Sequence, residues 1–177
     1  MSKFNLITSR LVLVLILSLS FHCKEPDNDT KQEQETTTEL VKITPQDINT
    51  INYTEFVLSN LARKKVNDWT KFKTLETEIE NLKSGTLSFF KDDKAVLQGF
   101  ITDLKNEVPE SLNKPSILVR LSVLETAMYK FDETINLQSS TKEAILKDIE
   151  RLLLAQNNFI YQINKVIEKA SQNIIKP

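Results

Sequence analysis

The chain has 177 residues, of which 23 are lysine or arginine and 24 are aspartate or glutamate, so its formal net charge at pH 7 is −1. This near balance provides no basic surface of the size that nucleic-acid binding requires, and we expect no nucleic-acid partner. A single histidine, a single cysteine and two glycines argue against zinc sites, histidine-dependent catalysis and glycine-rich phosphate loops.

The first 22 residues have the pattern of an export signal. Lys3 and Arg10 supply positive charge at the start, and an apolar run of about ten residues begins at Leu11. This run is too short to cross a bilayer as a helix, because a hydrocarbon core of about 30 Å requires about 20 residues. We therefore expect residues 1–22 to be a signal peptide that directs export of the chain.

The apolar run ends in Leu19-Ser20-Phe21-His22-Cys23, followed by Lys24-Glu25, and this stretch resembles the lipobox of bacterial lipoproteins, particularly those of the Bacteroidota. The resemblance implies that Cys23 becomes the first mature residue and carries diacylglycerol and an N-acyl chain such as palmitate. It also implies a location in the cell envelope, at the outer membrane, on its periplasmic or surface face. The alternative is an ordinary signal peptide followed by an unrelated cysteine.

Residues 23–43 are mostly polar and charged, and they predict a flexible tether. Apolar side chains occur only near the end of this segment, so it cannot bury enough surface to offset the entropy of ordering. A flexible chain of about 20 residues has a mean reach of roughly 25 Å, which is enough to clear the lipid headgroups. The remaining residues, 44–177, have a suitable length for one folded domain.

We expect this domain to be all-α and to begin with a long amphipathic helix. Thr44-Pro45-Gln46-Asp47 is a typical helix start, with a capping threonine, a proline in the first turn and an acid near the positive end of the dipole. Apolar residues then recur at steps of three and four over residues 48–82 without a proline. At Gly85 the helix either ends or bends and continues to Phe90, and we favour the bend.

Two shorter helices are predicted next. The second begins at a capping Asp92 or Asp93 and ends at Val108-Pro109, because a residue before proline avoids helical backbone angles. The third begins at Asn113-Lys114-Pro115, and its apolar residues alternate between steps of four and three. The short turn 138–140 then reverses the chain, so the third and fourth helices should be antiparallel. The apolar residues of the third helix are Ile117, Leu121, Leu124, Met128, Phe131 and Ile135.

The last helix has the strongest periodicity in the chain. Ser140-Thr-Lys-Glu143 has the spacing of a capping box at its start. Three rows of apolar residues follow at seven-residue intervals, which suits a helix packed against two or more neighbours. We therefore predict an antiparallel four-helix bundle with two long and two shorter helices. The rows are Leu146, Leu153, Ile160, Ile167 and Ile174; Ile145, Leu152, Phe159 and Val166; and Ile149, Ile163 and Ala170.

Three polar residues fall on or beside the predicted apolar seams, namely Glu76, Arg120 and Gln156. Because polar groups in a core must find partners, we interpret them as register-setting contacts, with Arg120 as a partner, rather than as a ligand site. The aromatic residues at helical spacing, including Tyr161, are expected to lie in the core. We interpret the basic run Arg63-Lys64-Lys65 as a solvated helix face, and contact with lipid headgroups or an acidic partner is the alternative.

These features predict a binding or scaffold protein and no enzyme. The only histidine, His22, lies in the predicted leader, and no two carboxylates are placed to act as a catalytic pair, so we expect no catalytic residue, metal or cofactor. The predicted partners are the membrane, through the lipid anchor, and either another envelope protein or a second copy of the chain. The alternative is a module that holds a small apolar ligand or lipid between its helices. A cavity on the order of several hundred cubic ångströms would favour that alternative.

Overall fold

The computed structural model describes residues 41–91 and 93–172 of the chain. The chain divides into two units, Met1–Thr37 and Thr38–Pro177, and every described residue belongs to the second unit. The predicted signal peptide, Cys23 and most of the predicted tether therefore lie outside the described residues. Within the described part every regular element is a helix, which confirms the prediction of an all-α fold.

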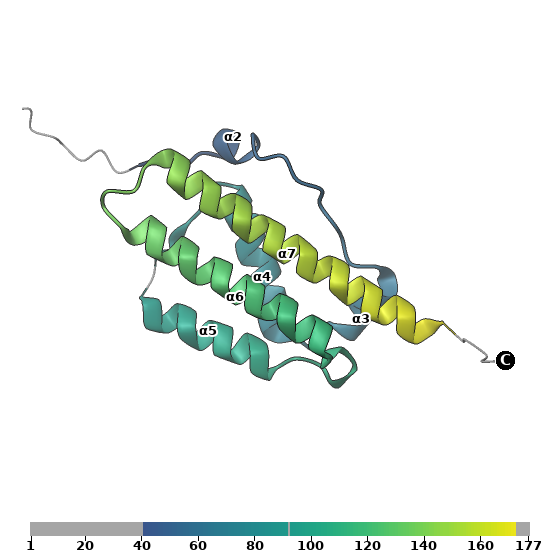
Figure 1. Cartoon of the computed structure of the whole chain (residues 1–177). Coiled ribbons are helices and arrows are strands. Elements are labelled where there is room, and N and C mark those ends of the chain that lie inside the picture. Colours follow the sequence, from purple (N-terminus) through teal and green to yellow (C-terminus); the bar gives the residue numbers. More distant parts are fainter. Residues whose placement is uncertain (1–40, 92, 173–177) are drawn as a thin grey trace, which may run out of the picture. The chain divides into compact units, whose positions relative to one another are not determined.

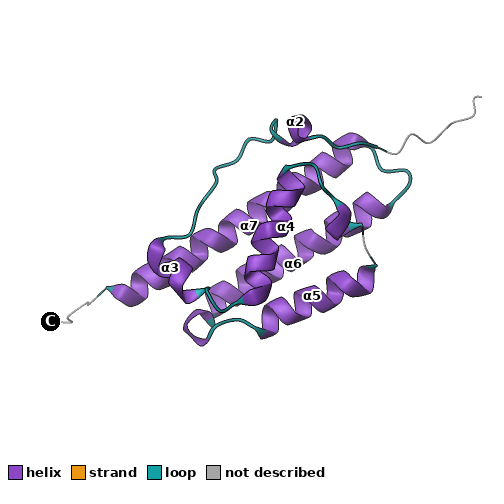
Figure 2. Cartoon of the chain, turned by 180° about the vertical axis from the view of Figure 1, so that it is seen from behind, coloured by secondary structure: helices purple, strands orange, loops and turns teal. Residues whose placement is uncertain are grey.

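The described part contains six α-helices and two short 3₁₀ turns, η1 and η2. The elements in chain order are α2 (Pro45–Ile48), α3 (Asn60–Lys65), α4 (Thr70–Lys83), η1 (Ser88–Phe90), α5 (Lys94–Asn106), η2 (Glu110–Leu112), α6 (Pro115–Asn136) and α7 (Lys142–Ser171). The two long helices, α6 and α7, run side by side in opposite directions (Figure 1). α5 lies beside α6, and α4 covers the face of these helices that Figure 2 turns toward the viewer.

The predicted long first helix is wrong, because α2, α3 and α4 occupy that part of the chain as separate pieces. α2 ends at Ile48, and residues 51–59 form no helix. The stretch Asn49-Thr50-Ile51-Asn52-Tyr53-Thr54 consists of residues with modest helix propensity, so little favours a helix there. Regular apolar spacing at 48–82 therefore indicates mostly core-facing side chains, with Leu61 as an exposed exception, and not a continuous helix.

The expected bend at Gly85 is also wrong, because α4 ends at Lys83. Gly85 adopts a φ of 83°, a left-handed conformation that glycine accepts readily. The Gly85 N–H donates to the Leu82 carbonyl and the Thr86 N–H donates to the Asn81 carbonyl, both at 2.9 Å. These two bonds form a Schellman motif, which terminates a helix by satisfying its last carbonyl groups.

The remaining helix boundaries agree with local sequence signals, with one shift. Asp93 caps α5 by accepting a hydrogen bond from the Ala95 N–H at 2.9 Å, and α6 starts at Pro115 as predicted. α7 is capped by Thr141, and not by Ser140 as predicted, because the Thr141 hydroxyl accepts the Ala144 N–H at 3.2 Å. The Ser140 hydroxyl instead donates to the Thr134 carbonyl at the end of α6.

The core is filled by apolar and aromatic side chains from every helix. Trp69, Phe72 and Phe159 form an aromatic cluster within it, with ring centroids 5.2 to 6.0 Å apart. The Trp69 indole N–H is satisfied, since it donates to the Leu104 carbonyl at 3.0 Å. The predicted rows of α6 and α7 are mostly buried, although Ile135, Leu146 and Val166 are only half-buried and Ala170 is exposed. Ile174 lies outside the described residues.

The start of the domain is fastened to α7 by an ion pair. Asp47 lies 2.7 Å from the Lys142 ammonium and also accepts hydrogen bonds from the Thr44 hydroxyl and backbone N–H. The Lys142 ammonium and the two Thr44 donors lower the pKa of Asp47 from 3.8 to about 2. The charged form of Asp47 is therefore the form that the folded state favours.

Asp47 is expected to make the domain sensitive to acid over a defined range. Because its pKa is lower in the folded state than in the unfolded state, its contribution is present above about pH 4 and is lost as the pH falls toward about 2. In urea melts, the difference in midpoint between the wild type and Asp47→Asn should shrink over this interval. A difference for Asp47→Asn that stays constant over this interval would contradict the assignment.

Candidate binding surface

A non-helical strap, residues 49–59, runs along the length of α7 from α2 to α3 (Figure 1). Two asparagines of α7, one heptad apart, hold its backbone. The Asn157 carbonyl oxygen accepts the Phe56 N–H at 2.8 Å. Asn164 accepts the Ser59 N–H and donates to the Val57 carbonyl, each at 2.8 Å. These side chains take the place of the helical hydrogen bonds that the strap lacks.

Sequence reasoning missed Asn157, which is only 3% exposed and whose side-chain nitrogen has no hydrogen-bond partner in the described part. The only sign of a shared role in the sequence is that Asn157 and Asn164 are seven residues apart, which places them on the same side of the helix. That side lies beside the apolar rows, where a polar residue is usually solvated, so the spacing alone does not indicate a buried role. Only the strap that lies over this flank of α7 explains why they are needed.

A second contact fixes the middle of the strap to the end of α4. The Lys83 ammonium pairs with the carboxylates of Glu55, on the strap, and Glu80, on α4. Partial burial opposes the charge on Lys83, but the two carboxylates outweigh it and raise the pKa of this lysine. By contrast, burial raises the pKa of the neighbouring Tyr53 hydroxyl, because it disfavours the charged phenolate. These contacts attach the strap to the domain and present no free reactive group.

The three polar residues predicted at the seams do not come together. Glu76 is half-buried on α4, burial raises its pKa, and its nearest cation is Arg63 at 4.0 Å. Arg120 is exposed on α6, so its predicted role as a buried partner is wrong. Gln156 is half-buried, and the fully buried amide is that of its neighbour Asn157. The prediction that these residues meet assumed a continuous first helix, and α2, α3 and α4 are separate pieces that pack differently.

Other buried polar groups lie where the α6–α7 turn closes. The Thr134 hydroxyl donates to the Asp148 carboxylate at 2.6 Å, and Arg151 pairs with the same carboxylate. Asn136 donates to both the backbone and side-chain oxygens of Asp132, at 2.9 and 3.0 Å. All these groups are satisfied by one another, so this cluster stabilises the turn and leaves nothing directed at a ligand.

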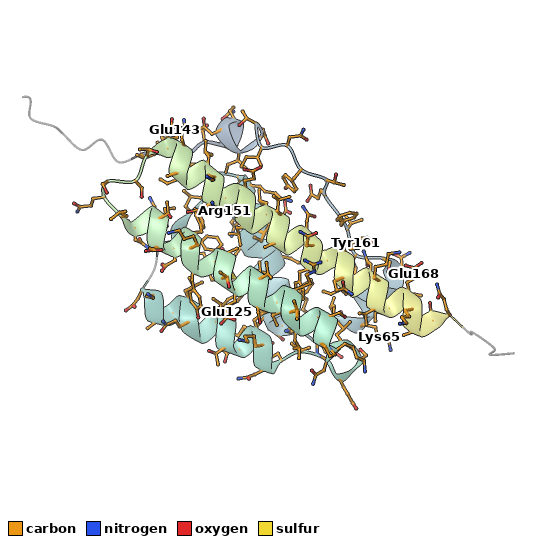
Figure 3. The ribbon with its side chains drawn as sticks, in the orientation of Figure 1. Lys65, Glu125, Glu143, Arg151, Tyr161 and Glu168 are labelled. Atoms are coloured by element: carbon orange, nitrogen blue, oxygen red, sulfur yellow. The ribbon has the colours of Figure 1, made fainter. Side chains whose placement is uncertain are left out.

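Exposed apolar side chains gather on two surfaces. The first, the α6 stripe, consists of Leu118, Val119, Ser122, Val123 and Thr126, carries no charge and lines a shallow hollow of about 380 Å³. The second, the strap patch, consists of Phe56, Val57, Leu61 and Tyr161. Tyr161 is 42% exposed, so its predicted place in the core is wrong. Its ring instead packs at 5.0 Å from that of Phe56, on the edge of α7 that faces the strap (Figure 3).

Two further hollows of the described part lie beside α3 and are open to solvent. One of about 350 Å³ lies between the end of the strap and the last turns of α7, and includes Val57, Leu61 and Ile167. Another of about 510 Å³ is lined by Asn60, Arg63, Lys64 and Asn67. Neither is enclosed by the helices. They suit contact with a surface better than retention of a small molecule.

Within residues 41–91 and 93–172, no three histidine, cysteine, aspartate or glutamate side chains are grouped so that they could hold a metal ion. Among the helices of this same part, none has both the length and the apolar character needed to span a membrane. No protein-family model, no curated protein and no solved structure matches the chain.

Proposed function

We propose that this chain is a lipid-anchored protein of the bacterial cell envelope whose helical domain is a non-catalytic binding or scaffold module. The observation that carries the proposal is the α6 stripe, an uncharged apolar surface on a domain whose buried polar groups are largely used to stabilise its own fold. Surfaces of this kind typically mark contacts with other macromolecules. The partner is another envelope protein or a second copy of this chain.

The proposal includes the organisation of the whole chain. Residues 1–22 are a signal peptide, and Cys23 carries the lipid at the outer membrane. The tether begins at Cys23 and is shorter than the predicted 23–43, because Val41 and Ile43 pack against the core of the domain. α4 to α7 form an antiparallel four-helix bundle. The opposite directions of α6 and α7 support this architecture. The tether and anchor would hold the bundle near the membrane without a membrane-spanning element of its own.

The absence of catalysis is part of the same proposal. Glu76 is the carboxylate that sequence reasoning placed in the core; its charged neighbours are Arg63, at 4.0 Å, and Glu80, which is itself paired with Lys83. Asp132 and Asp148 are buried, and each is already bound by neighbouring side chains. A carboxylate in an ion pair or a closed hydrogen-bond cluster serves structure more often than reaction.

A site-specific crosslinker tests the partner role in intact cell envelopes. A photoreactive residue at Val119, which is 61% exposed, should form one discrete adduct. Its mass should identify a second copy or one envelope protein. The same residue at exposed Lys147, on α7, is the matched control and should not form that adduct.

The identified partner must then bind the purified chain directly, and Val119→Arg should abolish the binding while leaving the melting temperature unchanged. If Val119 and Lys147 give the same diffuse adducts, or if Val119→Arg binds normally, the α6 stripe is not the binding surface and the proposal loses its main support.

A further inference from the structure

We propose that the end of the domain formed by α3 is a second membrane contact, which binds the surface of a bilayer containing anionic lipids. This α3 face consists of exposed Val57 and Leu61 together with the basic run Arg63-Lys64-Lys65. The inference rests on the proposed function only in that an anchored domain stays within reach of a membrane. The contact itself needs no lipid on Cys23.

The apolar part of the α3 face is unusually exposed. Val57 is 75% exposed and Leu61 is 53% exposed, although both lie beside the buried side chain of Leu58. They share the open hollow of about 350 Å³ with Ile167, and the Phe56–Tyr161 ring pair continues the apolar surface along α7. Single exposed leucines need no explanation, but adjoining apolar residues of this kind usually meet another surface.

The cations lie on the same short helix as Leu61. Ala62 and Val66 turn into the core, which leaves Leu61, Lys64 and Lys65 as neighbours on the exposed side. Within the described residues, neither Lys64 nor Lys65 forms an ion pair. Arg63 and Lys64 also line the open hollow of about 510 Å³, together with two asparagines. One hollow therefore offers hydrogen-bond donors and the other offers apolar surface, and both border α3.

Of the acids near this region, Glu76 and Glu168 face cations, and Asp68 is bonded to a neutral amide. Glu168 lines the apolar hollow and pairs with Lys165 at 2.8 Å. Asp68 accepts a hydrogen bond from the Asn67 side chain at 3.0 Å. Glu76 faces Arg63 at 4.0 Å, which leaves the two lysines as the cations available to an external anion.

The residue types favour a bilayer over a protein as the occupant. Lysine is depleted at the centre of protein interfaces, whereas lysines with long apolar stems beside aliphatic and aromatic side chains are typical of membrane surfaces. The lengths also agree. α7, with 30 residues, is about 45 Å long, and a tether of about 20 residues extends to about 65 Å at most. α2, at the start of the described domain, and the α3 face lie near opposite ends of α7 (Figure 1). A tether longer than this helix would let the anchor and the α3 face reach one membrane together.

Vesicle sedimentation with the mature chain, residues 23–177 carrying Cys23→Ser, tests the contact without the anchor or the apolar leader. The protein should sediment with vesicles of phosphatidylcholine plus phosphatidylglycerol, and far less with phosphatidylcholine alone. Binding should fall steeply as salt is added, because screening weakens lysine attraction to the anionic surface. Lys64→Glu/Lys65→Glu should weaken binding by at least about thirtyfold, from about fivefold per lysine.

Lys91→Glu/Lys147→Glu is the matched control, since it makes the same charge change away from α3, and it should bind anionic vesicles within about threefold of the wild type. Leu61→Ser should weaken binding to anionic vesicles without changing the melting temperature. Equal losses for both double variants, or no sedimentation of the Cys23→Ser chain with anionic vesicles, would overturn the α3 contact while leaving the proposed anchor and binding role intact. Binding of an envelope protein through Lys64 and Lys65, without vesicle binding, would also overturn it.

Discussion

Replacing Trp69 with alanine is expected to lower the free energy of unfolding by about 3 to 5 kcal/mol, a large share of the stability of a small domain. Trp69 is fully buried, stacks on Phe72 and meets the edge of Phe159. Its removal leaves a cavity at the centre of the aromatic cluster. It also leaves the buried Leu104 carbonyl without the indole N–H that it now accepts at 3.0 Å.

Urea melts monitored by helical circular dichroism measure this loss. Leu153→Ala and Ile160→Ala, on the buried face of α7, should each cost about 2 to 5 kcal/mol. Lys165→Ala and Glu168→Ala are the controls, because both side chains are exposed and an exposed ion pair contributes little, so each should leave the urea midpoint almost unchanged. Equal losses at buried and exposed positions would mean that the packing described for α7 is wrong.

Replacing Cys23 with serine is expected to move the protein from the detergent phase to the aqueous phase. A single acyl chain holds a protein to a membrane only weakly, but several chains hold it almost permanently, since each buried methylene contributes about 0.8 kcal/mol. The serine variant cannot be acylated and would lose this entire contribution. Phase separation of envelope extracts in a nonionic detergent, followed by immunoblotting, measures the distribution.

High salt in the partition removes any electrostatic contribution of Lys64 and Lys65, so that only the anchor is measured. Ser171→Ala, near the other end of the chain, is a control that leaves the cysteine intact and should remain in the detergent phase. Detergent partition of the Cys23→Ser variant equal to that of the wild type would rule out lipidation at this residue.

Boundaries set by neighbouring residues could be predicted with good accuracy. Asp93 can cap α5 because its side chain reaches the N–H of Ala95, two positions away, and Pro115 suits the first turn of α6 wherever that helix packs. The shift from Ser140 to Thr141 at the start of α7 has a tertiary cause. The Ser140 hydroxyl is engaged by the Thr134 carbonyl, and Thr141 is left to cap the helix.

The residues of the candidate surfaces could be predicted from the sequence only in part. The basic run Arg63-Lys64-Lys65 is visible in the sequence, but the exposure of Leu61 beside it is not, because Leu61 continues the apolar spacing of residues 48–82. Arg120 could be assigned to the core only on the assumption of a particular helix register. In the structure Arg120 is exposed to solvent, and the cation that lies near Glu76 is Arg63, at 4.0 Å.

The sequence by itself determined that this part of the chain is helical, about where α5 and α6 begin and end and, to within one residue, where α7 begins, because caps, prolines and apolar periodicity act within one or two turns. Tertiary structure alone decided that residues 49–59 are a strap. The strap replaces helical hydrogen bonds with bonds to Asn157 and Asn164, which lie about one hundred positions further along the chain. Local propensity there is too weak to prevail over such contacts, and no pattern within the segment itself records them.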